Sequence, residues 1–348
     1  MEKAIVERIG IAAAQGTPLV VRGGGSKDFL GRRRQGETLD VSGLRGIVQY
    51  EPTELVITAR AGTPLSEIEA ALAERGQMLG FEPPHFGTHA TLGGTIACGL
   101  SGPARPFRGA ARDFLLGTKV VNGKGELLRF GGEVMKNVAG YDVSRLMCGA
   151  YGTLGVLLEM SLKVLPRPAA EATLVFELDR ATALERMTGW QRTPLPLSGL
   201  CFTDGRLYAR LSGAEQAVAG ARRRLGGEVD VQGDVFWHGL REQRNGFFAR
   251  AGTLWRLSVP PVTRELTVGP DPLIDWGGAL RWVSAEDDPA DMFAAARTAG
   301  GHAMRWRGEN GEQIFQPLTP PLLQLHRRLK QAFDPQGIFN RGRMYPEY

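Results

Sequence analysis

Residues 90–102 read Ala-Thr-Leu-Gly-Gly-Thr-Ile-Ala-Cys-Gly-Leu-Ser-Gly, and together with Gly87 and Thr88 they form a run with almost no large side chains. Small residues at nearly every second position let a backbone lie against a flat or charged ligand, and Thr and Ser hydroxyls can donate hydrogen bonds to it. Tight packing without a ligand is the structural alternative. A purely structural segment rarely carries so little side chain over such a length, so we interpret residues 87–102 as a ligand-binding segment.

Two more glycine-rich segments can be interpreted in the same way. Residues 20–26 read Val-Val-Arg-Gly-Gly-Gly-Ser, and consecutive glycines directly after a strand can turn their N–H groups to one side, as a phosphate requires. A flexible turn is the alternative, because the spacing matches neither the dinucleotide nor the P-loop fingerprint. The third segment runs from Lys136-Asn137 through Gly149-Ala150-Tyr151-Gly152-Thr153-Leu154-Gly155-Val156, where a glycine loop again precedes a strand.

Composition limits the function classes. The chain has 348 residues, which suggests two domains, and 47 glycines, more of them in residues 1–168 than in the rest. Its net charge of +5 comes from scattered basic residues without interleaved aromatics, so a nucleic-acid partner is not expected. Three distant cysteines (Cys98, Cys148 and Cys201) make neither a disulfide framework nor a metal or iron–sulfur ligand set.

No apolar run reaches the length of a membrane span, and the N-terminal residues have the pattern of an amphipathic helix rather than a signal peptide. We expect a cytoplasmic protein, with peripheral association to a membrane only through partners. The expected fold class is α+β. The step Pro166-Arg167-Pro168 predicts a domain boundary, followed at 169–318 by two rounds of a ferredoxin-like pattern and at 319–348 by a helix and a tail.

The three glycine-rich segments, in this order, resemble the FAD-binding domain of the vanillyl-alcohol oxidase and p-cresol methylhydroxylase (PCMH) superfamily over residues 1–168. Within it the chain is most similar to the FAD-binding E subunits of bacterial glycolate oxidases. The segments Phe236–Glu242, Leu254–Ser258, Asp275–Trp282 and Phe333–Arg343 extend that resemblance over most of the chain.

The resemblance implies a PCMH-type FAD-binding domain of two α+β subdomains, a ferredoxin-like cap domain, and a C-terminal tail that returns to the flavin. Ser26 stands where members with covalent flavin often have histidine, so dissociable FAD is expected. The tail reads Asn340-Arg341-Gly342 instead of the usual Asn-Pro-Gly. The residues expected to contact FAD are Arg22, Gly23, Gly24, Gly25, Ser26, Lys27, Gly87, Thr88, Leu92, Gly93, Gly94, Thr95, Ala97, Gly99, Ser101, Gly102, Asn137, Gly140, Tyr141, Gly152, Gly155, Val156 and Asn340.

The catalytic residues are not assigned. Oxidation of a 2-hydroxy acid needs a base, a cation for the carboxylate and the flavin as hydride acceptor. The H-x-x-G-D-G-N and G-E-H-G motifs of related catalytic subunits are absent. Two histidines are candidates for facing the flavin: His238 and His302. Four arginines are candidates for binding a carboxylate: Arg241, Arg256, Arg281 and Arg305. Surface ion pairs or packing over tryptophans would explain these arginines equally well.

The implied function is that of the FAD-binding subunit of a glycolate oxidase complex, beside a catalytic FAD subunit and an iron–sulfur subunit. A self-sufficient FAD-dependent oxidase or dehydrogenase of a small hydroxy acid or alcohol is one alternative. A scaffold subunit with a structural flavin is the other.

Overall fold

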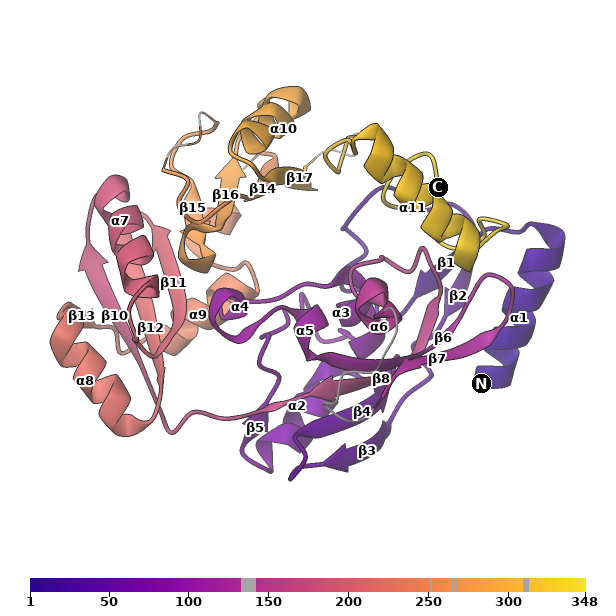
Figure 1. Ribbon diagram of the computed structural model, residues 1–348, viewed down its shortest axis with the longest axis horizontal. Helices are drawn as coiled ribbons and strands as arrows, with labels where there is room; N and C mark the ends of the chain where they lie inside the picture. The colour runs from indigo at the N-terminus through magenta and orange to yellow at the C-terminus, as the bar shows by residue number, and fades with distance from the viewer. Residues whose placement is uncertain (133–141, 251, 265, 267, 309–312) are drawn as a thin grey trace. The chain divides into compact units, whose positions relative to one another are not determined.

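The computed structural model describes residues 1–132, 142–250, 252–264, 266, 268–308 and 313–348. The chain forms two compact units (Figure 1). Unit 1 comprises Met1–Ser101, Ala110–Arg167 and Pro317–Tyr348, and unit 2 comprises Gly102–Gly109 and Pro168–Gln316. Residues 102–109 therefore pack with the second unit, although they lie inside the range 1–168 expected for the first domain. The α+β fold class is confirmed.

The first part of unit 1 is a small α+β layer. Its elements are α1 (Glu2–Gln15) and the parallel strands β1 (Leu19–Arg22) and β2 (Glu37–Asp40). Ile5, Ile9 and Ala12 recur at helical spacing and are buried, so α1 covers this layer with one apolar face. The helix ends at Gly16, whose left-handed backbone allows a sharp turn into β1.

The second part of unit 1 is an antiparallel sheet in the order β3-β4-β8-β6-β7. Its strands are β3 (Ile47–Glu51), β4 (Val56–Arg60), β6 (Leu115–Val121), β7 (Leu127–Gly131) and β8 (Val156–Lys163), and β5 (Gln77–Met78) pairs with β9 (Leu165–Pro166) in a separate ladder. The helices of this part are α2 (Leu65–Ala73), α3 (Leu92–Cys98), α5 (Ala111–Phe114) and α6 (Val143–Met147). Buried side chains of the strands and of α2, α3 and α5 form one core.

The C-terminal segment completes unit 1. Helix α11 (Pro320–Phe333) packs Leu329 and Phe333 against the core of the larger sheet. Beyond it, Ile338 and Phe339 are fully buried in the core of the small layer, and Phe339 forms a parallel bridge with Leu19 of β1. Residues more than 300 positions apart in the chain thus share one hydrophobic core.

Unit 2 is an eight-stranded antiparallel sheet in the order β13-β10-β12-β11-β15-β16-β14-β17. The first half is a complete ferredoxin-like motif, and the second repeats its strand arrangement with a helix only before the last strand, as the two rounds in the sequence indicated. The elements are α4 (Arg105–Arg108), β10 (Ala170–Glu177), α7 (Arg180–Gln191), β11 (Leu197–Thr203), β12 (Arg206–Gly213), α8 (Glu215–Leu225), β13 (Glu228–Val229), α9 (Gly233–Arg241), η1 (Gly246–Ala249), β14 (Leu254–Ser258), β15 (Leu273–Asp275), η2 (Trp276–Gly278), β16 (Leu280–Ser284), α10 (Pro289–Thr298) and β17 (His302–Arg307).

The helices of unit 2 cover the two faces of this sheet differently. Helices α7 and α8 pack on the first half and α10 on the second half, all on one face. Helix α9 lies on the opposite face, where Trp237 donates a hydrogen bond to Thr173 of β10. In the second half, the side chains of β14 that point away from α10 are those of Leu254, Arg256 and Ser258, because successive side chains alternate between faces.

Candidate functional site

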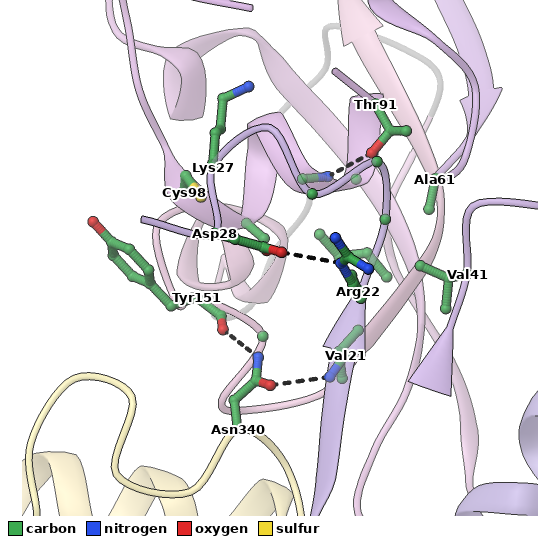
Figure 2. A pocket seen from close by; sticks show the side chains of 18 of the residues that line it. Val21, Arg22, Lys27, Asp28, Val41, Ala61, Thr91, Cys98, Tyr151 and Asn340 are labelled. Carbon is green, nitrogen blue, oxygen red and sulfur yellow. Dashed lines mark hydrogen bonds and ion pairs between the residues drawn. The ribbon is translucent and has the colours of Figure 1, made fainter. Parts of the chain in front are cut away.

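A pocket in unit 1 gathers residues from all of its parts (Figure 2). The space between its walls, counted together with the solvent at its open side, amounts to about 710 Å³. Its lining comes from the loop after β1, from α3, from the start of β8 and from the C-terminal tail. The lining residues are Val21, Arg22, Gly23, Gly24, Gly25, Ser26, Lys27, Asp28, Arg34, Val41, Ala61, Thr91, Gly93, Gly94, Ala97, Cys98, Tyr151, Gly152, Gly155, Leu157, Asn340 and Arg343.

The loop Gly23–Lys27 exposes its backbone to this pocket. Strand β1 ends at Arg22, and the loop then turns through Gly25, whose φ of 76° favours glycine. Within the described part of the chain, no hydrogen bond engages the N–H groups of Gly23, Gly24, Gly25 or Ser26. Unsatisfied N–H groups beside a pocket are the donors that an anionic group needs.

Charged side chains around the loop carry a net positive charge. Asp28 pairs with Arg22 at 3.0 Å and with Arg34 at 2.7 Å. Arg343 of the tail is 5% exposed, and burial, followed by the like charge of Arg34, lowers its pKa to about 10. Three guanidinium groups against one carboxylate make this end of the pocket attractive to an anion, which would also relieve the cost of burying Arg343.

Lys27 has a different role. Its ammonium donates to the backbone oxygen of His85 and to the hydroxyl of Ser26, both at 3.3 Å, and lies 5.8 Å from the ring centre of Phe86. Figure 2 shows the side chain pointing away from Arg22 and Asp28. Lys27 therefore fastens the glycine loop to the segment that precedes α3.

Helix α3 presents two glycines with unlike surroundings. Thr91 caps the helix, its hydroxyl accepting from the N–H of Gly94 at 3.4 Å. A Cβ on Gly93 would lie 2.7 Å from the Cβ of Ala61, so Gly93 is required by packing. A Cβ on Gly94 would meet only the Thr91 hydroxyl, at 3.3 Å, and otherwise face open space. Gly94 is therefore the glycine of α3 whose small size leaves room in the pocket.

Asn340 joins three segments at the other end of the pocket. Its side chain accepts from the N–H of Val21 at 3.0 Å and donates to the backbone oxygen of Tyr151 at 2.7 Å (Figure 2). Its own N–H donates to Leu19 at 2.9 Å. A Cβ on Gly152 would lie 2.8 Å from the Asn340 amide, so glycine at 152 lets the tail approach this closely.

The pocket brings together many of the residues expected to contact FAD: Arg22, Gly23, Gly24, Gly25, Ser26, Lys27, Gly93, Gly94, Ala97, Gly152, Gly155 and Asn340. Others expected there lie outside its lining: Gly87, Thr88, Leu92, Thr95, Gly99, Ser101, Gly102 and Val156. Asn137, Gly140 and Tyr141 lie outside the described residues.

The expected residues outside the lining have structural surroundings. Leu92, Thr95 and Val156 are at most 1% exposed. Ser101 accepts a hydrogen bond from the N–H of Ala111, and Gly102 belongs to unit 2. The periodic small residues of this segment therefore do not distinguish the side of α3 that lines the pocket from the side that faces the core.

Sequence reasoning missed the charged and tail residues. Asp28 and Arg34 follow the loop within twelve residues of Arg22, and Arg34 belongs to a cluster that suggested only a solvated face. Arg343 lies three residues after Asn340, in the tail that was expected to return to the flavin. That expectation is the one sequence signal that could have indicated a role for Arg343 in the pocket. Cys98 also lines the pocket, and burial raises the pKa of its thiol, so it is a neutral wall residue.

The six histidine and arginine candidates in unit 2 do not form one site. His238 and Arg241 both lie on α9, with 3.2 Å between the Arg241 Nη2 and His238 Nδ1 atoms. Arg241 also forms an ion pair with Glu242, with 3.0 Å between Nε and Oε1. Arg281 of β16 is 2% exposed, donates to the backbone oxygen of Thr263, and has its pKa lowered to about 10, mainly by burial. The strand register places Arg281 on the sheet face covered by α10 and His302 on the opposite face.

Within the described ranges, no helix is long and apolar enough to cross a membrane, and no three His, Cys, Asp or Glu side chains are grouped as metal ligands.

The pocket fits the diphosphate of FAD. Four free N–H groups and three guanidinium groups suit two negatively charged phosphates, and a Cβ on Gly94 would meet only the Thr91 hydroxyl. Apolar walls formed by Val21, Val41, Ala61 and Leu157 suit the uncharged parts of such a cofactor.

Two family descriptions match the chain. Residues 1–131 match the FAD binding domain, and residues 313–344 match the C-terminal domain of FAD linked oxidases. Both ranges contribute to the pocket, the first through the glycine loop and α3, the second through Asn340 and Arg343.

Several known proteins are similar to the chain. The glycolate oxidase subunit GlcE of Escherichia coli is 54% identical over 345 residues, covering 99% of this chain and 97% of that protein. The glycolate oxidase subunit GlcD of Bacillus subtilis is 31% identical, over 47% of this chain and 35% of its own length. A solved structure of alkyldihydroxyacetonephosphate synthase superposes with a TM-score of 0.67 at 15% identity, over 97% of this chain and 74% of that one, which supports the fold expected from the PCMH superfamily. The chain belongs to the family of FAD-linked oxidase proteins that includes E. coli GlcE.

Proposed function

We propose that this chain is the FAD-binding subunit of a complex that oxidises glycolate to glyoxylate. The observation that carries the proposal is the similarity to a glycolate oxidase subunit along the full length of both chains, at 54% identity. The pocket in unit 1 supports it, since its free N–H groups, cations and open glycine position suit FAD.

In this proposal unit 1 holds the cofactor. The N–H groups of the Gly23–Ser26 loop and the guanidinium groups of Arg22, Arg34 and Arg343 bind the diphosphate. Asn340 ties the tail to β1 and to Tyr151, and so closes the pocket from the C-terminal side. FAD supplies the hydride acceptor that no side chain of the protein can provide.

The flavin is held without a covalent bond. Ser26 stands at the end of the glycine loop, where a histidine would be needed for the linkage expected from the superfamily. Its hydroxyl accepts from Lys27 and is not a nucleophile toward a flavin methyl group. Residues 1–168 with the tail 319–348 then make the FAD-binding domain, apart from residues 102–109, which pack with unit 2, and residues 169–318 make the cap domain.

The proposed partner subunits supply chemical groups that the sequence of this chain lacks. The histidine motifs of catalytic subunits and a cysteine set for an iron–sulfur cluster are absent from the sequence. We propose that a catalytic FAD subunit and an iron–sulfur subunit complete the complex, and that this chain takes part in moving electrons from substrate to acceptor. The complex would lie in the cytoplasm and reach a membrane only through those partners.

The first experiment measures bound flavin. The purified chain is expected to carry about one FAD, released into the supernatant by acid precipitation. Gly94→Val should lose it to below about a tenth of the wild-type ratio, because the added methyl groups fill the pocket where a Cβ now meets open space. Gly10→Val is the matched control, a helical glycine of unit 1 with nothing within 4 Å of its Cβ position.

A colourless wild-type protein that takes up no FAD would refute the cofactor assignment. Equal flavin in Gly94→Val and Gly10→Val, with both folded by circular dichroism, would refute the site.

The second experiment distinguishes the three roles considered for the chain: electron-transfer subunit, self-sufficient dehydrogenase and scaffold. Flavin that glycolate reduces only after the partners are added supports an electron-transfer subunit. Reduction by glycolate in the isolated chain would favour the self-sufficient dehydrogenase. A complex that stays fully active with flavin-free Gly94→Val would favour the scaffold.

A further inference from the structure

A buried lysine of α11 lies behind the pocket of unit 1. The ammonium of Lys330 donates to the Asp334 carboxylate at 2.7 Å. It also donates to the backbone oxygen of Thr153 at 2.8 Å and to that of Phe339 at 2.9 Å, so its three donors are all satisfied. Burial lowers the pKa of this ammonium, and the charge of Asp334 opposes that shift. A charged group in the interior costs desolvation, which these bonds must offset.

The two backbone oxygens that Lys330 binds belong to residues next to the pocket lining. Thr153 follows Gly152, and Phe339 precedes Asn340. Gly152 and Asn340 both line the pocket, whereas Lys330 does not. The ammonium therefore joins two parts of the pocket wall, one residue behind the surface that faces a ligand.

One of these parts is a turn at Ala150–Thr153 whose backbone needs support. The N–H of Thr153 donates to the oxygen of Ala150 at 2.9 Å. The two residues between them, Tyr151 and Gly152, have φ values of 54° and 67°, as the central residues of a type I′ turn do. Glycine adopts this conformation readily, but for tyrosine it is strained, and such strain persists only where surrounding contacts hold it.

Hydrogen bonds to α3, to the tail and to α11 hold this turn from outside. The N–H of Tyr151 donates to the oxygen of Ala97 at 2.8 Å, and the oxygen of Tyr151 accepts from the Asn340 side chain at 2.7 Å (Figure 2). The bond from Lys330 to Thr153 differs from these two because its donor carries a full charge. Charge-assisted hydrogen bonds are roughly twice as strong as neutral ones, so Lys330 contributes strongly to the order of the turn.

The end of α11 does not by itself require the lysine. The carboxylate of Asp334 accepts the N–H groups of Ile338 at 3.0 Å and of Phe339 at 2.8 Å, and these bonds fold the tail back onto the end of the helix. The bond from Lys330 to Thr153 instead reaches a segment 177 positions away in the chain. That segment is the one that lines the pocket.

We propose that Lys330 is a positioning residue for FAD. Its ammonium fixes the turn at Tyr151 and Gly152 relative to Asn340, so that both face the cofactor in one arrangement, although Lys330 does not line the pocket. The choice of FAD as the ligand rests on the proposed function. The order of the turn can be measured in the flavin-free chain.

The experiment compares two variants of the full-length chain. Lys330→Met combined with Asp334→Asn removes the ammonium without leaving a buried carboxylate charge unpaired, and the Asn oxygen can still accept from the tail. Leu72→Ala is the matched control, because Leu72 is a fully buried residue of α2 that does not line the pocket. Both variants should lower the urea midpoint of unit 1, so they separate lost stability from lost positioning.

The dissociation constant for FAD, measured by titrating flavin-free protein, should rise about tenfold or more in the double variant, because bonds to a charged group are lost. It should stay at the wild-type value in Leu72→Ala. Hydrogen exchange of the backbone amides of residues 150–154, measured without flavin, should become faster in the double variant only.

Wild-type FAD affinity in the double variant, or an equal loss of affinity in Leu72→Ala, would overturn the proposal. Unchanged hydrogen exchange at residues 150–154 would do the same. A double variant that lacks the circular dichroism of the folded chain would assign Lys330 to stability alone and would also overturn it. Wild-type protein that takes up no FAD would refute the proposed cofactor, whereas the exchange measurement would still decide whether Lys330 orders the turn.

Discussion

Replacing Asn340 by alanine should destabilise unit 1 and leave unit 2 unchanged. The residue is 3% exposed, and its side chain satisfies the N–H of Val21 and the backbone oxygen of Tyr151. Each buried backbone group left without a partner costs about 1–3 kcal/mol, so the two groups together cost about 2–6 kcal/mol. Asn340 also has a φ of 39°, where alanine costs about 1 kcal/mol more.

The sum predicts a loss of about 3–7 kcal/mol in the free energy of unfolding of unit 1. Urea unfolding followed by two signals tests it. All six tryptophans lie between positions 190 and 306, so their fluorescence reports unit 2, whereas flavin release reports unit 1. Asn340→Ala should shift the flavin-release midpoint to lower urea with the tryptophan midpoint unchanged.

Asn340→Asp refines the test. One carboxylate oxygen can still accept from Val21, but the other then faces the oxygen of Tyr151, which raises the pKa of the new carboxyl in the folded state. A folded-state pKa above the unfolded value means that stability increases as pH falls toward the unfolded value, because protonation restores a donor. Equal stability of Asn340→Ala and wild type, or a pH-independent Asn340→Asp, would refute the reasoning.

Three further predictions rest on single contacts. Asp334→Ala leaves the buried ammonium of Lys330, now 2.7 Å from that carboxylate, without its counter-charge, and should cost about 3–5 kcal/mol in urea unfolding; a loss below about 1 kcal/mol would contradict it. Gly24→Ala should fail to fold, because its Cβ would collide with the backbone oxygen of His89; a folded variant of wild-type thermal stability would show that the loop adapts. Arg105→Met should raise the pKa of the His302 imidazole in an NMR titration, because that pKa is lowered by burial and also by the charges of Arg256 and Arg105; an unchanged pKa would contradict this expectation.

The local pattern of small residues pointed to the glycine loop after β1 and to residues 87–102, because such a pattern depends only on neighbours in the chain, but it did not predict that Leu92–Cys98 form a helix. The sequence alone could not show why each individual position requires glycine. Gly24 and Gly93 are required because His89 and Ala61 lie against them, whereas Gly94 borders the pocket. Only the packing of the folded chain distinguishes a glycine that makes room for a ligand from one that makes room for the protein.

Side-chain partners distant in sequence were the main omission. Arg343 is 309 positions from Arg34, yet the two lie close enough for the charge of Arg34 to lower the pKa of Arg343. Thr63 shows a similar ambiguity: a Thr-Pro pair before an apolar helical pattern is typical of a helix cap, but α2 begins at Leu65 and the Thr63 hydroxyl bonds to the backbone of Gly46 instead. A capping residue and a tertiary hydrogen-bonding residue have the same local pattern, and the fold decides between them.

The position of Ile338 and Phe339 sets an order of events during synthesis. Both are fully buried in the core that α1 and β1 begin, so that core has an unfilled gap until the ribosome has released this segment. Unit 2 is encoded up to Gln316 and has its complete set of strands before then. Domains fold as units while the chain is being made, so unit 2 can mature first while the earliest residues wait. A chain terminated before Ile338 would therefore contain every glycine of the pocket and still lack Asn340 and Arg343, so cofactor loading reports that synthesis has passed these residues.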